Sequence, residues 1–180
     1  MPYTLVVPEI NLFDERTNEF IEIPGQDIKI EHSLVSLSKW ETKWCVPFLT
    51  KEAKTDEQIR DYVRCMTLTQ NVKPEIYEFM PSQIVNEALE YINAQSTATT
   101  IKKDNAPPSR QIITSELIYG WMVTLNIPFE CQKWHLNRLM MLIQVVNRLN
   151  APSKKMPRNE MLAERRALNA SRRKRLGTKG

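Results

Sequence analysis

Few residues of this 180-residue sequence have the type and spacing that catalysis needs. The histidines His32 and His135 fall in no HExxH, HxH or Cys/His pattern that would hold a metal ion. Walker, GxGxxG and GxSxG motifs do not occur in the sequence. The acidic pair Asp56-Glu57 stands where the start of a helix favours carboxylates. We therefore predict a protein that is not an enzyme, needs no metal or cofactor, and uses both histidines structurally.

The four tryptophans are a second candidate for chemistry. Trp40 and Trp44 each follow a lysine, and an aromatic ring beside a basic residue can stack on a nucleobase. The tryptophans also recur with leucines at helical spacing, which favours packing in a core, because aromatic rings fill such faces well. We interpret them as core residues.

Charge divides the sequence more sharply than its net value of +4 suggests. Residues 154–180 carry ten Lys and Arg but two Glu, for a charge of +8. Residues 1–153 carry 15 basic and 19 acidic residues, for a charge of −4. An acidic body with a basic tail is a better guide to binding partners than the overall isoelectric point.

The basic tail contains the candidate binding residues. Its Arg-Arg pairs recur seven residues apart, which predicts an amphipathic helix with one basic face. Such a face can bind phosphate with release of counterions, or dock on an acidic protein surface. A solubilising, unstructured end is the alternative. The candidate partner-binding residues are Arg165, Arg166, Arg172, Arg173, Lys174 and Arg175.

The cellular compartment is indicated by cysteines and by hydrophobicity. Cys45, Cys65 and Cys131 are odd in number and far apart, which fits a reducing compartment better than a disulfide framework. The first ten residues lack the charged start and continuous apolar stretch of a signal peptide. Charged residues interrupt the apolar stretches, so no run of about 18 uncharged residues could span a membrane. We expect a soluble, cytoplasmic protein.

The first thirty residues read as a small antiparallel sheet. Apolar residues at 5–7, 10–12 and 20–23 flank a turn-rich segment at 14–18, as in a hairpin. Residues 28–31 alternate apolar and charged side chains, which suits a third strand with one wet face.

From about Ser33 the apolar spacing becomes helical. One helix should run from Ser33 until Pro47 ends it, and a second should start at Thr55, which has capping-box spacing with Gln58. A short helical turn is expected over 74–79. Ser82 is predicted to cap a further helix.

The segment 114–151 is predicted to organise the rest of the chain. It reads as two helices joined by a tight hinge at Asn126-Ile127-Pro128. The second helix, over 130–149, has a narrow polar stripe, so we expect other elements to wrap it as the central core helix.

These patterns together predict an α+β fold. A small N-terminal antiparallel β-sheet (1–32) packs on a mainly α-helical bundle (33–152), and a basic C-terminal tail (153–180) is helical or disordered. The polar, threonine-rich stretch at about 95–110 has too little apolar surface to offset its ordering entropy, so we predict a mobile loop there. A helix over 159–176 has too few apolar residues for a core of its own.

Four stretches together resemble a known class of proteins: 34–49 (LVSLSKWETKWCVPFL), 62–71 (YVRCMTLTQN), 114–147 (TSELIYGWMVTLNIPFECQKWHLNRLMMLIQVVN) and 166–180 (RALNASRRKRLGTKG). They are similar to small proteins encoded in the tail-gene region of tailed bacteriophages, and most like the tail assembly chaperones. The resemblance implies a role in virion morphogenesis. Such chaperones bind the long, helical tape measure protein and recruit tail tube subunits around it.

Two alternatives stay open beside this reading. The first is a structural tail or baseplate component, which would be present in the virion, whereas a chaperone would stay in the host cytoplasm. The second is a nucleic-acid-binding module that acts through the basic tail, and its binding would weaken steeply with salt. A homo-oligomer is compatible with each of these readings.

Overall fold

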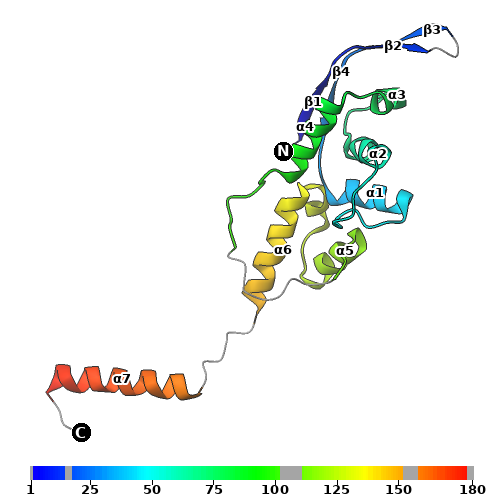
Figure 1. The fold of residues 1–180 in the computed structure, drawn as a ribbon. Coiled ribbons are helices and arrows are strands. Elements are labelled where there is room, and N and C mark those ends of the chain that lie inside the picture. The colour runs from blue at the N-terminus through cyan, green and yellow to red at the C-terminus, as the bar shows by residue number, and fades with distance from the viewer. Residues whose placement is uncertain (1, 15–17, 102–110, 152–157, 178–180) are drawn as a thin grey trace. The chain divides into compact units, whose positions relative to one another are not determined.

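The structure is a computed structural model that describes residues 2–14, 18–101, 111–151 and 158–177 (Figure 1). Within these residues the fold is α+β and mainly helical, with antiparallel strands first and helices after them, as the sequence predicts. The elements are β1 (Tyr3–Val7), β2 (Ile10–Asp14), β3 (Glu19–Ile23), β4 (Gln26–Ile30), α1 (Leu34–Trp44), α2 (Asp56–Met66), α3 (Pro74–Glu78), α4 (Ser82–Asn93), α5 (Ser115–Thr124), the 3-10 helix η1 (Phe129–Lys133), α6 (Leu136–Asn150) and α7 (Arg158–Leu176).

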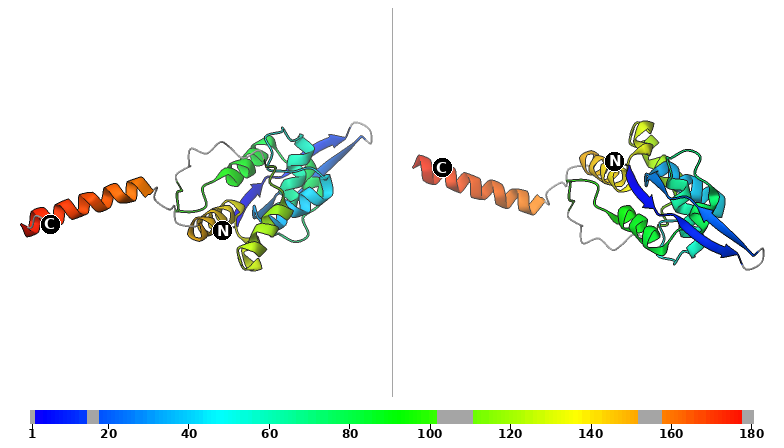
Figure 2. Two further views of the ribbon diagram at one scale, coloured as in Figure 1. Left: turned by 90° about the horizontal axis from the view of Figure 1, so that it is seen from below. Right: turned by 90° about the horizontal axis from the view of Figure 1, so that it is seen from above.

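The strands form one long hairpin in two ladders. β1 pairs with β4, from Tyr3 opposite Ile30 to Val7 opposite Gln26, and β2 pairs with β3. Pro8 and Pro24 stand between the ladders, and proline has no N–H to donate to a partner strand. The prolines thus separate the two ladders, and the first predicted strand pairs with the last. The β2–β3 ribbon extends past the helices of the body (Figure 2).

The starts of α1, α2 and α3 follow local sequence chemistry. Ser33 caps α1 and Thr55 caps α2, each in a capping box with the residue three positions on. Pro74 occupies the first turn of α3, where its missing N–H costs nothing. The prediction that Ser82 caps α4 is wrong. The cap position is Pro81, with no side-chain hydrogen bond, and Ser82 already belongs to the helix.

Two apolar clusters form the core. The first joins β1, β4, α2, α3 and α4, and includes Leu5, Ile28, Ile30, Tyr62, Val63, Met66, Ile76 and Ala88. The second joins α5, η1 and α6, and includes Ile118, Met122, Cys131, Leu136, Leu139 and Ile143. Helix α1 contributes to both, with Trp40 in the first cluster and Leu34 and Leu37 in the second. Helix α1 therefore links the two clusters.

The prediction that the helix over 130–149 is the central core helix is wrong. Helix α6 buries three side chains, Leu136, Leu139 and Ile143, whereas Leu149 is 79% exposed. The apolar residues on its other side are only half-buried, because no described element covers them fully. An apolar side chain that no element covers remains exposed to solvent. Such exposure is common on the surfaces of folded proteins.

The hinge after α5 is confirmed, but its second helix starts later than predicted. Asn126 adopts a left-handed conformation with φ 53°, which asparagine tolerates better than most residues. Pro128 then starts η1, and α6 begins only at Leu136. Between them, His135 forms an isolated antiparallel bridge with Ser33. The backbone of α6 is thereby attached to the start of α1.

The chain divides into two compact units, Met1–Asn147 and Arg148–Gly180. The predicted mobile loop at about 95–110 falls mostly outside the described residues, and the described part, 95–101, has no helix or strand. The tail helix predicted over 159–176 is confirmed as α7. None of the helices in the described part of the chain is both long enough and apolar enough to cross a membrane.

Candidate interaction surfaces

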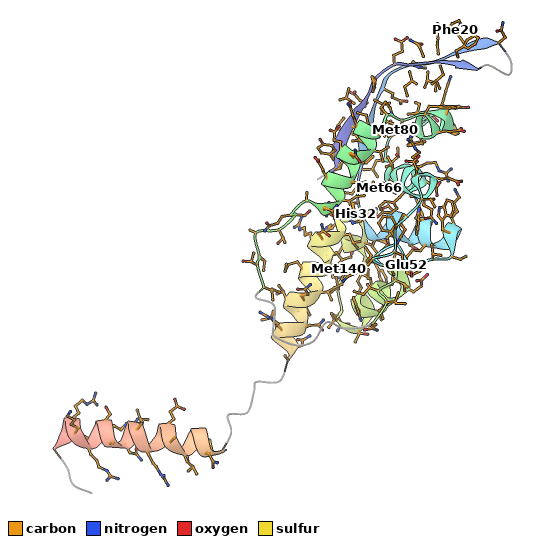
Figure 3. The ribbon with its side chains drawn as sticks, viewed as in Figure 1. Phe20, His32, Glu52, Met66, Met80 and Met140 are labelled. Carbon is orange, nitrogen blue, oxygen red and sulfur yellow. The ribbon has the colours of Figure 1, made fainter. Side chains whose placement is uncertain are left out.

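The two histidines predicted to be structural meet in the interior. His32 is 1% exposed and His135 is 4% exposed, and their rings meet edge to face with centroids 5.2 Å apart. His32 Nδ1 lies 2.6 Å from the hydroxyl oxygen of Tyr62. His135 Nδ1 accepts from the backbone N–H of Asn137, and its Nε2 lies 3.3 Å from the carbonyl oxygen of Tyr91. Figure 3 places His32 among the helices of the body.

These surroundings favour the neutral form of both rings. Burial, and then the neighbouring His135, lower the pKa of His32 to about 3. Burial also lowers the pKa of His135. A carbonyl can only accept, so the contact with Tyr91 places the single proton of His135 on Nε2. A charged His135 would turn a second N–H toward the N–H of Asn137. The pair therefore acts as a neutral polar contact between elements.

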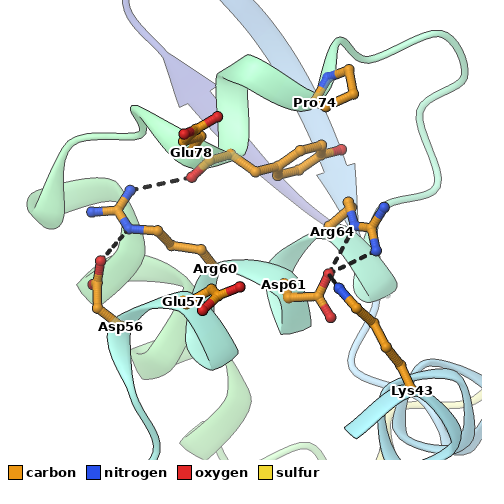
Figure 4. Close-up of a pocket in the computed structure, with 9 residues that line it drawn as sticks. Lys43, Asp56, Glu57, Arg60, Asp61, Arg64, Pro74 and Glu78 are labelled. Atoms are coloured by element: carbon orange, nitrogen blue, oxygen red, sulfur yellow. Dashed lines mark hydrogen bonds and ion pairs between the residues drawn. The ribbon is translucent and has the colours of Figure 1, made fainter.

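A pocket of about 500 Å³ lies beside α2 and α3 and contains the acidic pair considered above (Figure 4). Asp61 accepts hydrogen bonds from Lys43 at 2.8 Å and from Arg64 at 2.9 Å. Arg60 pairs with Asp56 and donates to backbone carbonyl oxygens at the end of α3. The three cations of this pocket thus already bind groups of the protein itself.

The carboxylate of Asp61 is stabilised in its charged form. Burial alone would raise its pKa, but hydrogen bonds from Lys43 and Trp44 and the charge of Arg64 outweigh burial and lower the pKa. Trp44 Nε1 donates to Asp61 at 2.8 Å. The Asp61 carboxylate of α2, which accepts hydrogen bonds from Lys43 and Trp44 of α1, is therefore a structural link between the two helices. Among the described residues, no group of three or more His, Cys, Asp or Glu could hold a metal ion.

The tryptophans lie in or against the two apolar clusters. Trp40 is fully buried and donates through Nε1 to the carbonyl oxygen of Gln58 at 2.9 Å. Trp44 packs on the first cluster, and Trp121 and Trp134 pack on the second. The prediction of core packing is confirmed for these rings. A nucleobase could not stack on Trp40 without unfolding the body.

All six candidate residues of the tail lie on α7, and every one is exposed. At 3.6 residues per turn, four of them, Arg165, Arg166, Arg172 and Arg173, share one face of the helix. The other two, Lys174 and Arg175, lie outside it. The predicted single basic face is thus correct for four of the six residues. We call those four the basic face of α7.

Apolar residues accompany the basic face. Leu162 and Leu176 lie within it, and Met161 and Leu168 lie along its edge. These four side chains are between 40% and 67% exposed. A helix that presents both leucines and arginines to solvent has the composition of a protein-binding helix, because leucine contributes little to contacts with a phosphate backbone.

One exposed feature was missed in the sequence. Phe13 of β2 and Phe20 of β3 are cross-strand partners, 49% and 76% exposed, with ring centroids 5.0 Å apart. Leu12, next to Phe13, packs against the first apolar cluster, and strict alternation along β2 would have placed Phe13 on the outer face. Phe20 follows from Phe13, because the two are cross-strand partners.

Comparison of the chain with protein-family models, with curated proteins and with solved structures gave no match. The function proposed next is therefore supported by the residues and geometry of this chain and by the resemblance described above.

Proposed function

We propose that this protein is a non-enzymatic tail assembly chaperone of a tailed bacteriophage, which binds the tape measure protein while the tail is built in the host cytoplasm. The tail tube protein is the second expected partner. The resemblance of four stretches of the sequence leads to this class. The properties of α7 are the observation in the structure that supports it.

Helix α7 supports binding to a protein. Its 19 residues contain the basic face and four exposed apolar side chains, and no described side chain of the helix is buried. Most helices in proteins gain their stability from packing of an apolar face, and the described side chains of α7 have no such packing. A partner that covers the leucines and offers carboxylates to the arginines would supply that packing.

The partner implied by the resemblance fits this chemistry. A tape measure protein is long and helical, so it offers repeated helical surfaces along its length. Many weak contacts with such a polymer add to a strong overall attachment, because each later contact forms within the same complex. The basic face would add attraction that is strongest at low salt.

The first experiment is co-expression of the full chain with the tape measure protein, followed by co-purification at low and at moderate salt. We expect the wild type to retain the tape measure protein. A variant with Arg172, Arg173, Lys174 and Arg175 replaced by Gln should retain less, chiefly at low salt, since exposed charges are screened within about 8 Å at physiological ionic strength.

A matched pair of variants tests whether retention of the tape measure protein depends on the basic face of α7 or on net charge alone. Arg172→Gln with Arg173→Gln removes two charges from the face, and Lys174→Gln with Arg175→Gln removes two from outside it. The first pair should weaken retention more than the second. Equal effects would indicate attraction by net charge, without a defined face.

The alternatives predict other outcomes. If wild type does not retain the tape measure protein and is found in purified particles in fixed copy number, the protein is a virion component and the chaperone proposal fails. Binding of duplex DNA with affinity that falls steeply as salt rises would instead identify a nucleic-acid-binding module.

A further inference from the structure

A groove on the body combines an apolar floor with a basic rim. It has a volume of about 460 Å³ and lies between the start of α1, the end of α2 with the residues that follow it, and η1. A second hollow of about 370 Å³, lined by Lys39, Lys43, Arg64 and Cys65, shares Lys39 and Cys65 with it. We call the two together the α1–α2 groove.

The rim of the groove carries positive charge that is not neutralised within the described residues. Lys39 of α1 and Lys133 of η1 are exposed, and no carboxylate among the described residues lies within ion-pair distance of either. The carboxylate of Glu31 also lines the groove, but that residue is 7% exposed and accepts from the hydroxyl of Tyr91. In the second hollow, Lys43 and Arg64 share the single carboxylate of Asp61.

The floor of the groove is apolar and held in place. Leu68, which is 55% exposed, and the half-buried Val35 both line the groove. The backbone at Leu68 and Met66 is attached to the end of β4 and the residue after it, since Leu68 N–H donates to the carbonyl of Lys29 at 2.8 Å and the N–H of Glu31 donates to the carbonyl of Met66 at 2.9 Å. A surface already fixed by such bonds loses little freedom when a ligand binds.

We propose that the α1–α2 groove binds an extended, acidic segment of a partner protein, with an apolar side chain over Leu68 and Val35 and carboxylates at Lys39 and Lys133. Charge complementarity identifies the occupant, because residues 1–153 have a net charge of −4 and this groove concentrates cations. The apolar floor favours a peptide over a phosphate. The inference does not depend on the partner proposed for α7. Helix α7 itself is basic, so it is not the occupant of a groove with a basic rim.

The test uses the full-length protein and fluorescence anisotropy of a short fluorescein-labelled peptide in which glutamates flank a central leucine. The double variant Lys39→Glu with Lys133→Glu should bind this peptide about tenfold more weakly, which corresponds to about 1.4 kcal/mol. Replacement of the central leucine by glycine should also weaken binding. Both lysines are exposed, so the variant should melt at the wild-type temperature.

The matched control is Lys51→Glu with Lys73→Glu, which reverses the same number of exposed charges outside the groove. It should change the affinity less than about twofold, as is usual for remote surface charges. A second control replaces Arg172, Arg173, Lys174 and Arg175 by Gln and should leave most of the binding intact.

Four results would overturn the proposal: no binding of the peptide to wild type, unchanged binding to the groove variant, equal losses in the groove variant and the Lys51/Lys73 control, or loss of binding on neutralisation of the tail alone. Tighter binding of a single-stranded oligonucleotide than of the peptide, sensitive to the groove variant, would also overturn it in favour of a phosphate ligand.

Discussion

At the scale of single residues, the buried histidine pair has the clearest consequence. His32 and His135 come from positions far apart in the chain and lie where β4 runs into α1 and η1 runs into α6. The N–H of Leu136 donates to the carbonyl of His32 at 2.7 Å, so a backbone hydrogen bond joins the same two segments. Tyr62 and Tyr91 complete the polar surroundings of the rings. Protonation of His32 would place a buried charge there, whereas the charge of Glu31 partly offsets the effect of burial on His135.

The free energy of unfolding should therefore fall with acidity below neutral pH. The pKa of His32 is about 3 in the folded protein and 6.5 without burial, so the unfolded chain binds more protons between these values. Stability is then fully present above the unfolded pKa and is lost as pH falls, by about 1.4 kcal/mol per pH unit for one histidine. Urea unfolding at about pH 7 and about pH 5 should differ by about 2 kcal/mol.

The variant His32→Asn supplies the control for this pH dependence. It should be less stable than wild type at neutral pH, because the contact with Tyr62 is altered, but its stability should change less between the two pH values. The carboxylates are common to both proteins, so the difference between them isolates the ring. An equal pH dependence in the two proteins would show that His32 is not the source.

At the scale of elements, the crossing between the two ladders of the hairpin depends on a glycine. A Cβ on Gly25 would lie 2.9 Å from Glu9 N and 3.0 Å from Val7 O, which are backbone atoms that cannot rotate away. Gly25→Ala should lower the free energy of unfolding by about 1–3 kcal/mol, the usual range for overpacking. Chemical denaturation would measure the change.

A glycine-to-alanine substitution in α5 should have the opposite effect on the free energy of unfolding. Gly120 has open space around its Cβ position and is exposed in a helix, where alanine is better than glycine by about 0.5–1 kcal/mol. Gly120→Ala should therefore raise the free energy of unfolding. If both variants are destabilised alike, the close approach at Gly25 is not the cause of its effect.

Helix α6 offers a second prediction at this scale. Leu139→Ala and Ile143→Ala should each cost about 2–5 kcal/mol of unfolding free energy, because both side chains are buried in the second apolar cluster. Leu149→Ala, on a side chain 79% exposed, should cost less than about 0.5 kcal/mol. Thermal unfolding that is unchanged in the first two variants would contradict the burial of α6 in the body.

At the scale of the whole molecule, the body should fold without α7. The described side chains of α7 are exposed, and its sparse apolar residues offer little area to bury. A chain that lacks residues 157–180 should melt at nearly the temperature of the full-length protein in differential scanning calorimetry. A large drop would mean that α7 packs in the folded protein, and the proposed binding role of its basic face would lose its support.

Sequence patterns predicted the features that depend on neighbours along the chain. The capping boxes at Ser33 and Thr55 were readable because both partners of each box are three residues apart. The start of α3 at Pro74 and the hinge before Pro128 were readable because proline acts on its own backbone. Helix α1 ends at Trp44, before the predicted stop at Pro47, because Cys45 adopts a left-handed conformation. The tail helix and the division of charge were also readable, because they depend on residues close together in the sequence. Ser82 was misplaced because a serine near a helix start can stand inside the first turn as well as at the cap.

Only the tertiary structure decided what each apolar face meets. Periodicity shows that one side of a helix can be buried, but it does not say which element covers it, so α6 was taken for the centre while α1 links the two clusters. The pairing of β1 with β4, the meeting of His32 with His135, and the placing of Lys39 beside Lys133 on one groove join residues distant in sequence. Such contacts arise from the summed burial of many side chains, and no local pattern of residues encodes them.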